Sequence, residues 1–449
     1  MTGTAPPLWR QLQAAAAVLA AVRRGESGSA ALDRTAAPLR PAAQALAFHA
    51  LRQLGRAEAL RRQLARRAPP AAADAILCTA LALCWRADEA PYDAFTLVDQ
   101  AVEAAKRQPA TGGQASFINA CLRRFLRERE ALVAATDADP VARWNHPLWW
   151  IQRLQREYPR HWQRILEANN SQPPLTLRVN ARKAARGAYL HRLEGEGIAA
   201  VPVGEHGVVL ERARGVHAVP GFDEGVVSVQ DAAAQLAAPL LLQGLAVATG
   251  PGPLRVLDAC AAPGGKTGHL LELADAAVTA LDVDPARCER IRETLQRLGL
   301  QARVVAADAG DPSAWWDGEP FDAILLDAPC TASGIVRRHP DVRWLRRESD
   351  IARLAQVQAR LLAVLWPLLR PGGRLLYCTC SVFRAEGEVQ ARTFVAHNKE
   401  ALSRPAPGHL LPQGGANDNP LPDNLEGDHD GFYFALLEKR DPGPAAQGS

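Results

Sequence analysis

Predicted strands alternate with predicted helices through the second half of this sequence, from about residue 232 to residue 441. Such alternation is typical of a mostly parallel sheet that carries helices on both faces. The expected strands are Arg255–Ala259, Val278–Asp282, Arg303–Ala306, Ala323–Leu326 and Arg374–Cys378, with Gly431–Leu437 as a late edge strand. Sheets of this kind bind ligands at the carboxyl ends of their strands, so we expect the functional site there.

The N-terminal part of the chain, residues 8–135, has the apolar spacing of α-helices. Ser116 is expected to cap a helix with an apolar stripe formed by Phe117, Ile118, Cys121, Leu122, Phe125 and Leu126. Residues 1–135 hold 18 Lys and Arg against 11 Asp and Glu, whereas the whole chain has a net charge of only +4. This basic segment is compatible with a phosphate-rich partner, and equally with a solvated arginine face.

The remaining patterns divide the chain into further segments. A polar stretch near Asp137–Pro140 is expected to be a linker. A mixed region follows, with a tryptophan-rich helix around Trp149–Glu157 and short strands at Leu175–Val179 and Val208–Leu210. We therefore expect a helical domain at 1–137, a small α+β module at 144–231, an α/β domain at 232–441 and a disordered tail at 442–449.

Composition excludes several classes of protein. Hydrophobic residues make up 48% of the chain, the mean hydropathy is −0.14, and no apolar run approaches the ~18 residues of a membrane span. The alanine-rich stretch Ala14–Val22 lacks the unbroken core of a signal peptide and is followed directly by Arg23. Eight cysteines without a CxxC pair do not form a disulfide framework, and Cys378 and Cys380 have no second ligand pair nearby for zinc. We expect a cytoplasmic protein without a bound metal or a membrane anchor.

Polar motifs follow the expected strands of the α/β domain. The segment Asp258–Thr267 follows the first strand, and its glycines let the backbone approach a ligand closely. Asp282 ends the second strand, where a carboxylate can accept hydrogen bonds from both ribose hydroxyls, and Asp308 follows the third. The segment Asp327–Gly334 follows the fourth strand, and Thr379-Cys380-Ser381 ends the fifth. Together these motifs predict a nucleotide-like methyl donor held beside two thiols.

The motifs resemble those of the RNA cytosine-5 methyltransferases, and the resemblance spans about residues 3–440. It implies an α/β, Rossmann-like class I methyltransferase domain, a small module that helps to form the RNA groove, and an all-α NusB-like RNA-binding domain at the N-terminus. The segment Phe117–Arg124 matches the last helix of that domain, so the arginines beside it become expected RNA contacts. The implied cofactor is S-adenosylmethionine and the implied substrate is small-subunit ribosomal RNA. We expect a monomer.

The resemblance also implies roles for single residues. The expected ligands of the methionine part of the cofactor are Cys260, Ala261, Ala262, Pro263, Gly264, Gly265 and Lys266. Asp282 matches the ribose ligand, Asp308 would meet the adenine amino group, and Asp327 lies between cofactor and cytosine. Two alternatives stay open, since Lys266 could point to solvent and Asp308 could cap a helix. Asp284 is expected to cap the helix that begins at Pro285.

Two thiols suit the chemistry that the resemblance implies. C5 of cytosine becomes nucleophilic only after covalent addition at C6, and a thiolate is well suited to that addition. Cys380 matches the family's nucleophile, and Cys330 matches the thiol that assists product release. After Cys380 the sequence departs from the family's Pro-Glu-Glu-Asn pattern: Arg384 and Gly387 replace proline and asparagine, whereas Glu386 is kept. We therefore expect an altered loop shape with both thiols retained.

A basic run follows the Cys330 motif and is a candidate for contacts to the substrate backbone. Its members are Arg337, Arg338, His339, Arg343, Arg346 and Arg347. A solvated loop would have the same composition, so both interpretations stay open.

Two other functions share some of these features. A DNA cytosine methyltransferase would use Cys330, the thiol that follows Pro329, as its nucleophile, but the second thiol, Cys380, argues against this class. A non-catalytic RNA-binding or antitermination factor fits the helical N-terminal part alone. The presence of Asp327 together with both thiols argues against the loss of catalysis.

Overall fold

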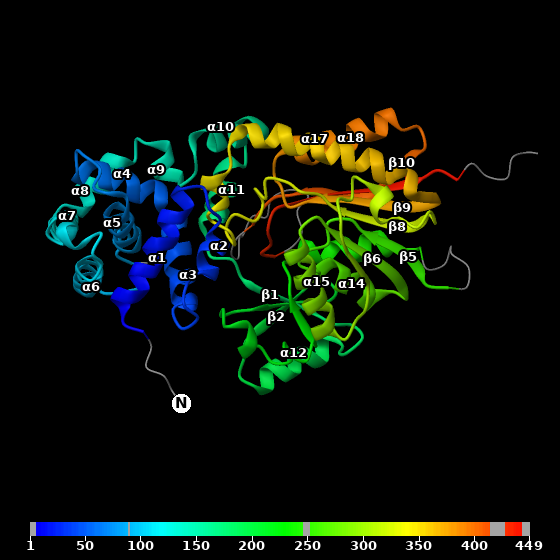
Figure 1. Ribbon diagram of the computed structural model, residues 1–449, viewed down its shortest axis with the longest axis horizontal. Coiled ribbons are helices and arrows are strands. Elements are labelled where there is room, and N and C mark those ends of the chain that lie inside the picture. The colour runs from blue at the N-terminus through cyan, green and yellow to red at the C-terminus, as the bar shows by residue number, and fades with distance from the viewer. Residues whose placement is uncertain (1–5, 89, 246–251, 414–426, 442–449) are drawn as a thin grey trace, which may run out of the picture. The chain divides into compact units, whose positions relative to one another are not determined.

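The computed structural model describes residues 6–88, 90–245, 252–413 and 427–441, and Figure 1 shows its ribbon. The expected disordered tail, 442–449, lies outside the described residues. The chain forms two compact units: residues 1–171 with 336–348, and residues 172–335 with 349–449. Within the described residues, no helix is both long enough and apolar enough to cross a membrane.

The core of the first unit is built around α5, which is buried along most of its length and contacts α1, α3, α4, α6 and α7. The helices are α1 Leu8–Arg23, α2 Gly28–Asp33, α3 Arg40–Arg52, α4 Leu54–Leu64, α5 Ala71–Cys84, α6 Ala94–Lys106, α7 Ala115–Arg127, α8 Arg129–Thr136, α9 Pro140–Trp144, α10 Leu148–Glu157, α11 Trp162–Asn170 and α16 Val342–Leu345. An apolar helix surrounded by others is the expected centre of such a bundle, because it has no face that favours water.

Two predictions for this unit are refined by the structure. The apolar stripe of α7 is confirmed, since Ile118, Cys121, Leu122 and Phe125 are buried. Ser116 does not cap this helix, because α7 already begins at Ala115. The expected linker near residues 137–140 instead starts a helix: the Asp139 carboxylate accepts a hydrogen bond from the N–H of Val141 and caps α9.

Residues 336–348 belong to the helical unit, although they lie between two strands of the α/β sheet in the sequence. Arg343 is fully buried, and its guanidinium donates to the backbone carbonyl of Asn169 at 2.6 Å. Asp341 accepts a hydrogen bond from the N–H of Gly28 at 2.8 Å. Arg337 is also fully buried. The prediction that Arg337 and Arg343 contact a substrate backbone is therefore wrong, because a guanidinium enclosed in a protein core cannot reach a phosphate.

The second unit contains a small antiparallel sheet with the strand order β2-β3-β1-β4 and the helix α12 Arg186–Gly195. Its strands are β1 Leu175–Val179, β2 Ala200–Val203, β3 Gly207–Leu210 and β4 Val227–Val229. The positions of β1 and β3 agree with the sequence prediction. The strands β2 and β4 were not predicted, because β2 is an edge strand that includes Pro202 and β4 has only three residues.

The second unit also holds a seven-stranded sheet with the order β10-β11-β9-β8-β5-β6-β7. Its strands are β5 Leu254–Asp258, β6 Ala276–Asp282, β7 Arg303–Ala306, β8 Phe321–Asp327, β9 Leu369–Thr379, β10 Ala401–Leu410 and β11 Phe432–Lys439. The strands β5 to β9 pair in parallel, whereas β11 and β10 are antiparallel additions. The edge strand β10 was not predicted, because Pro405 and Pro407 interrupt it, and prolines are tolerated in a sheet only at such an edge.

Helices cover both faces of this sheet (Figure 1). They are α13 Ala237–Leu242, α14 Gly265–Leu273, α15 Pro285–Leu298, α17 Glu348–Leu365 and α18 Glu388–His397. Successive strand residues enter different cores: Leu257 packs in the core that contains α17 and α18, whereas Val256 packs in the core that contains α13, α14 and α15. The chain runs outward from β5 in one direction to β7 and returns to β8 on the other side, so the strand order reverses between β5 and β8. That reversal is the expected position of a ligand site.

Candidate active site

The predicted motifs all follow parallel strands of the large sheet, so their side chains gather at one edge. Asp258 ends β5, Asp282 ends β6, Asp327 ends β8 and Thr379 ends β9. The carboxyl ends of parallel strands meet at the same edge, and the reversal between β5 and β8 lies among them. The structure therefore brings together residues that are up to 121 positions apart in the sequence.

The loop after β5, residues 260–264, is a tight turn that leads directly into α14. The N–H of Gly264 donates to the carbonyl of Ala261 at 2.7 Å, and the hydroxyl of Thr294 donates to the carbonyl of Pro263 at 2.8 Å. Gly264 has a φ of 96°, a left-handed conformation that other residues rarely adopt, and a Cβ there would lie 3.2 Å from the Cα of Ile291. This loop can bring backbone groups close to a ligand at the start of a helix.

Asp258 offers an acceptor at the base of this loop. Its carboxylate is fully buried, and one oxygen accepts a hydrogen bond from the Thr267 hydroxyl at 2.7 Å. Its other oxygen, Oδ1, has no hydrogen-bond partner among the described residues. Burial raises the pKa of Asp258 to about 7. A buried oxygen without a partner is an acceptor that a bound ligand with a donor group would satisfy.

The carboxylates after β6 and β7 differ in their surroundings. Asp282 is buried, with Arg287 at 3.4 Å from its Oδ2. Asp284 accepts a hydrogen bond from the N–H of Ala286 and caps α15, as predicted. Asp308 is exposed, and it accepts from the N–H of Gly310 at 2.8 Å and pairs with Arg360 at 3.0 Å. The hydrogen bond from the Gly310 backbone, together with Arg360, lowers the pKa of Asp308. Asp308 does not cap a helix, because the nearest helical turn follows Asp311.

Lys266 and Asp327 form an ion pair at the reversal between β5 and β8. The Lys266 ammonium lies 2.6 Å from the Asp327 carboxylate and 5.4 Å from the ring centre of Phe432. Burial opposes the charge of Lys266, but the adjacent carboxylate outweighs this effect, so the pKa of Lys266 lies above its ordinary value. Lys266 thus points into the site, which excludes the alternative that it lies in solvent.

The two thiols after β8 and β9 lie in contact. The sulfur atoms of Cys330 and Cys380 are 3.5 Å apart, and both residues are free thiols. Cys330 is buried, whereas Cys380 is partly exposed. The hydrogen bond with Cys380, together with burial, raises the pKa of the Cys330 thiol well above its ordinary value. The site therefore pairs a thiol that stays protonated with a more accessible one.

Close backbone packing holds the Cys330 loop against its surroundings. The N–H of Gly334 donates to the carbonyl of Cys380 at 2.9 Å, and the N–H of Gly431 donates to the carbonyl of Gly334 at 2.9 Å. A Cβ at Gly334 would lie only 2.0 Å from the carbonyl oxygen of Gly431. Ala332 has a φ of 57°, which is unusual for a residue with a side chain. The glycine of the Cys330 motif is thus required by contact with a distant backbone segment.

Glu386 was identified from the sequence only as a residue kept from the family's Pro-Glu-Glu-Asn pattern, and no role in the site was predicted for it. This residue is fully buried in the short helical turn Arg384–Glu386 after β9. Its carboxylate accepts hydrogen bonds from Thr331, next to Cys330, and from Ser381, next to Cys380. The retained glutamate between two departures from the family pattern was the signal that could have identified it.

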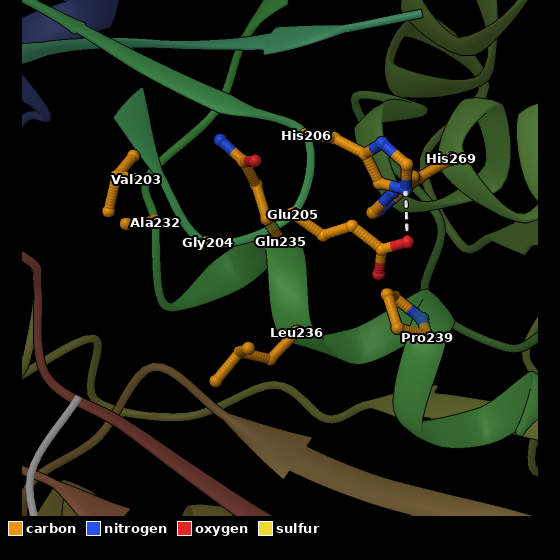
Figure 2. A pocket seen from close by; sticks show the side chains of 9 residues that line it. All are labelled: Val203, Gly204, Glu205, His206, Ala232, Gln235, Leu236, Pro239 and His269. Carbon is orange, nitrogen blue, oxygen red and sulfur yellow. Dashed lines mark ion pairs between the residues drawn. The ribbon is translucent and has the colours of Figure 1, made fainter. Parts of the chain in front are cut away.

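A separate small cavity, shown in Figure 2, lies near α14 and the loop between β2 and β3. It has a volume of about 90 Å³ and is lined by Val203, Gly204, Glu205, His206, Ala232, Gln235, Leu236, Pro239 and His269. None of the predicted site residues lines this cavity. No group of three metal-binding side chains was found among the described residues.

Comparisons with known proteins agree with this architecture. The family model for the 16S rRNA methyltransferase RsmB/F matches residues 251–438, that for the RsmF/B-like ferredoxin-like domain matches 146–217, and that for the NusB family matches 11–127. These matches confirm the predicted fold class, and they identify the small middle module as ferredoxin-like.

Individual proteins resemble most of the chain. The ribosomal RNA small subunit methyltransferase B of Vibrio cholerae serotype O1 is 41% identical over 440 residues, which cover 95% of this chain and 96% of that protein. The protein of the same name from Salmonella paratyphi B is 44% identical over 356 residues, or 78% of each chain. The crystal structure of PH0851 has a similar fold, with a TM-score of 0.71 and 24% identity over 95% of this chain and 99% of that one. A methyltransferase homolog from Pyrococcus horikoshii has a TM-score of 0.53 and 28% identity over 67% of this chain and 98% of its own. The chain therefore belongs to the RsmB/F family of 16S ribosomal RNA methyltransferases.

Proposed function

We propose that this protein methylates C5 of a cytidine in 16S ribosomal RNA through a transient covalent bond between Cys380 and C6 of the base. The observation that carries this proposal is the contact of 3.5 Å between the sulfurs of Cys380 and Cys330, beside the Lys266–Asp327 ion pair. Family membership supports the reaction and the ribosomal RNA substrate. S-adenosylmethionine is the cofactor of this methyltransferase family and supplies the methyl group.

The chain offers a site that fits this cofactor. The turn at 260–264 allows close approach of backbone groups, and the free Oδ1 of Asp258 can accept a hydrogen bond from a donor of the ligand. We assign Cys260, Ala261, Ala262, Pro263, Gly264, Gly265 and Lys266 to the methionine part, Asp282 to the ribose and Asp308 to the adenine. Asp308 would have to share its carboxylate with Arg360, so we expect its contribution to be smaller than that of Asp282.

Cys380 is the better candidate for the nucleophile. It is more accessible than Cys330, and the raised pKa of Cys330 keeps that thiol protonated at neutral pH. The Cys380 thiolate forms a bond to C6 of the cytosine, and the electrons of the C5–C6 double bond make C5 nucleophilic. Asp327, which is positioned by Lys266, can hydrogen-bond the base and stabilise the charge that develops on it.

Cys330 then assists the release of the product. After methyl transfer, the C5 proton is lost to water, and the electrons of the C5–H bond restore the C5–C6 double bond. The C6–S bond breaks, and Cys380 leaves as a thiolate. The S–H group of Cys330, at hydrogen-bond distance from the departing sulfur, stabilises this thiolate.

The other expectations from the sequence are kept as proposals. We assign RNA binding to the helical unit, in which Arg123 and Arg124 lie exposed on α7. We propose the domain limits 1–137, 144–231 and 232–441, although residues 144–171 and 336–348 fold with the helical unit. We further propose that the protein is a monomer, and that it is cytoplasmic, since ribosomal RNA is its substrate and none of its eight cysteines forms a disulfide.

Bisulfite sequencing of 16S ribosomal RNA from cells with and without the gene tests the proposed activity. C5-methylated cytidine resists conversion, so one cytidine should be protected only when the gene is present. Reintroducing the Cys380→Ala variant should leave that cytidine unprotected. Equal conversion of every cytidine in the two strains would contradict the proposal.

A further inference from the structure

Glu386 is a buried carboxylate that contacts both thiol loops, and the steps of the proposed reaction leave it without a role. On the Cys330 side, the N–H of Thr331 donates to Oε1 of Glu386 at 2.9 Å, and the Thr331 hydroxyl donates to Oε2. Thr331 is the residue directly after Cys330. The carboxylate therefore holds the backbone and the side chain of the neighbour of one thiol.

The same carboxylate holds the neighbour of the other thiol. The hydroxyl of Ser381, the residue directly after Cys380, donates to Oε2 of Glu386 at 2.6 Å. The Ser381 hydroxyl in turn accepts a hydrogen bond from the N–H of Phe383 at 3.1 Å. One side chain thus joins two segments that are 50 residues apart in the sequence.

The backbone of Glu386 is itself fixed to the strand that carries Cys380. Its carbonyl accepts hydrogen bonds from the hydroxyl of Tyr377 at 2.6 Å and from the hydroxyl of Thr379 at 3.2 Å, and both donors lie on β9. Gln358 of α17 donates to the carbonyl of Pro329, next to Cys330, at 2.9 Å. Glu386 is therefore a fixed point to which the Cys330 loop is attached.

The donors around Glu386 explain why a carboxylate occupies this position. Its partners on both loops are two hydroxyl groups and a backbone N–H, and all three donate to it. An ionised carboxylate only accepts hydrogen bonds, whereas a glutamine would present an NH₂ group to one set of these donors. A buried charge without function is costly, so its presence calls for a role that an apolar residue could not fill.

We propose that Glu386 is a positioning residue that ties the two thiol loops together and sets the contact between the sulfurs of Cys330 and Cys380. This inference rests on the proposed function, because it concerns two successive steps of that reaction: covalent addition by Cys380 and product release assisted by Cys330. Release depends on the sulfur contact and addition does not. Loss of the tie should therefore slow the release step more than the addition step.

The test measures two rates for full-length Glu386→Gln with target RNA and S-adenosylmethionine: formation of the covalent adduct and its decay to methylated product. We expect decay to slow about tenfold, the scale of one hydrogen bond to a charged group, while formation changes less than about threefold. The matched control is Glu388→Gln, a partly exposed glutamate two residues further along, which should behave as the wild type.

Variants at the two ends of the tie keep the test decisive if Glu386→Gln folds poorly. Thr331→Val removes the hydroxyl on the Cys330 side and should slow decay of the adduct. Thr331→Ser keeps the hydroxyl and should show the wild-type decay rate. Ser381→Ala removes the link on the Cys380 side of the same tie, so it should also slow decay more than formation. Equal slowing of both steps in the Thr331 and Ser381 variants, or wild-type rates in both, would overturn the inference. Absence of any adduct in the wild-type protein would instead contradict the proposed function itself.

Discussion

The cofactor loop and the two thiol loops lie at the same edge of one sheet, but they are held in different ways. The loop at 260–264 is fixed by the hydrogen bond from Gly264 to Ala261, by the helix that starts at Gly265, and by hydrogen bonds to β6 and α15. The thiol loops are held by contacts between distant segments, such as Glu386 with Thr331, which are 55 residues apart. The first arrangement centres on a short turn that can be recognised from a motif. The second depends on tertiary packing, so its disruption should affect stability and chemistry together.

The largest effect is expected at the backbone contact of the Cys330 loop. In Gly334→Ala the added Cβ would lie 2.0 Å from the carbonyl oxygen of Gly431, so the two segments must separate. We expect a loss of about 3 kcal/mol in the free energy of unfolding, together with loss of activity. Thermal and denaturant unfolding measure the first effect. Gly187→Ala, at a helical position with open space around it, is the control and should not destabilise the protein. Wild-type stability of Gly334→Ala would show that the thiol loops are not held by this contact.

A smaller effect is expected for Asp282 in the cofactor site, where a substitution should weaken cofactor binding only. Asp282→Ala removes a buried carboxylate that we assign to the ribose hydroxyls. Its loss should weaken S-adenosylmethionine binding by about 1.5–3 kcal/mol, the scale of hydrogen bonds to a charged group. Isothermal titration calorimetry measures this change, with the exposed Glu289 of α15 mutated to alanine as a control. An unchanged affinity would remove Asp282 from the site.

The smallest effect is expected for Gly264→Ala in the cofactor loop. The φ of 96° strains any residue with a Cβ, which costs about 1–2 kcal/mol. Because the hydrogen bonds described for this loop lie within it or reach β6 and α15, and not the thiol loops, we expect weaker cofactor binding while the covalent reactivity of the thiols is retained at saturating cofactor. Titration calorimetry and adduct formation measure the two properties separately. A loss of thiol reactivity at saturating cofactor would mean that the two regions are coupled.

The difference between motifs and tertiary contacts also explains which parts of the fold and the site could be predicted from the sequence. The strands β5, β6, β8 and β9 and their motifs were predicted because buried parallel strands are continuous apolar runs. The edge strand β10 and the short strand β4 were missed, since edge and short strands lack that pattern. The contact between Cys330 and Cys380 was implied only by resemblance to a family.

Residues 336–348 are the clearest example of a segment whose burial could not be predicted from the sequence. Their arginines suggested a surface for RNA, yet Arg343 and Arg337 are fully buried. Arginine is usually exposed, and only the tertiary structure provides the carbonyl acceptors that satisfy Arg343 in the helical unit. Glu386 was underestimated for the same reason, because its partner Thr331 comes from a loop 55 residues away.

The central claim is that the two thiols have different tasks, and trapping the covalent adduct tests it most directly. Labelled target RNA is incubated with S-adenosylmethionine and the wild-type, Cys380→Ala or Cys330→Ala protein, and then separated on a denaturing gel. We predict that Cys380→Ala forms no adduct, because no nucleophile is left to attack C6. We predict that Cys330→Ala adds through Cys380, stalls before release and accumulates a protein–RNA complex that requires both the cofactor and the target cytidine. An adduct that persists in Cys380→Ala and vanishes in Cys330→Ala would reverse the roles of the thiols and contradict this account.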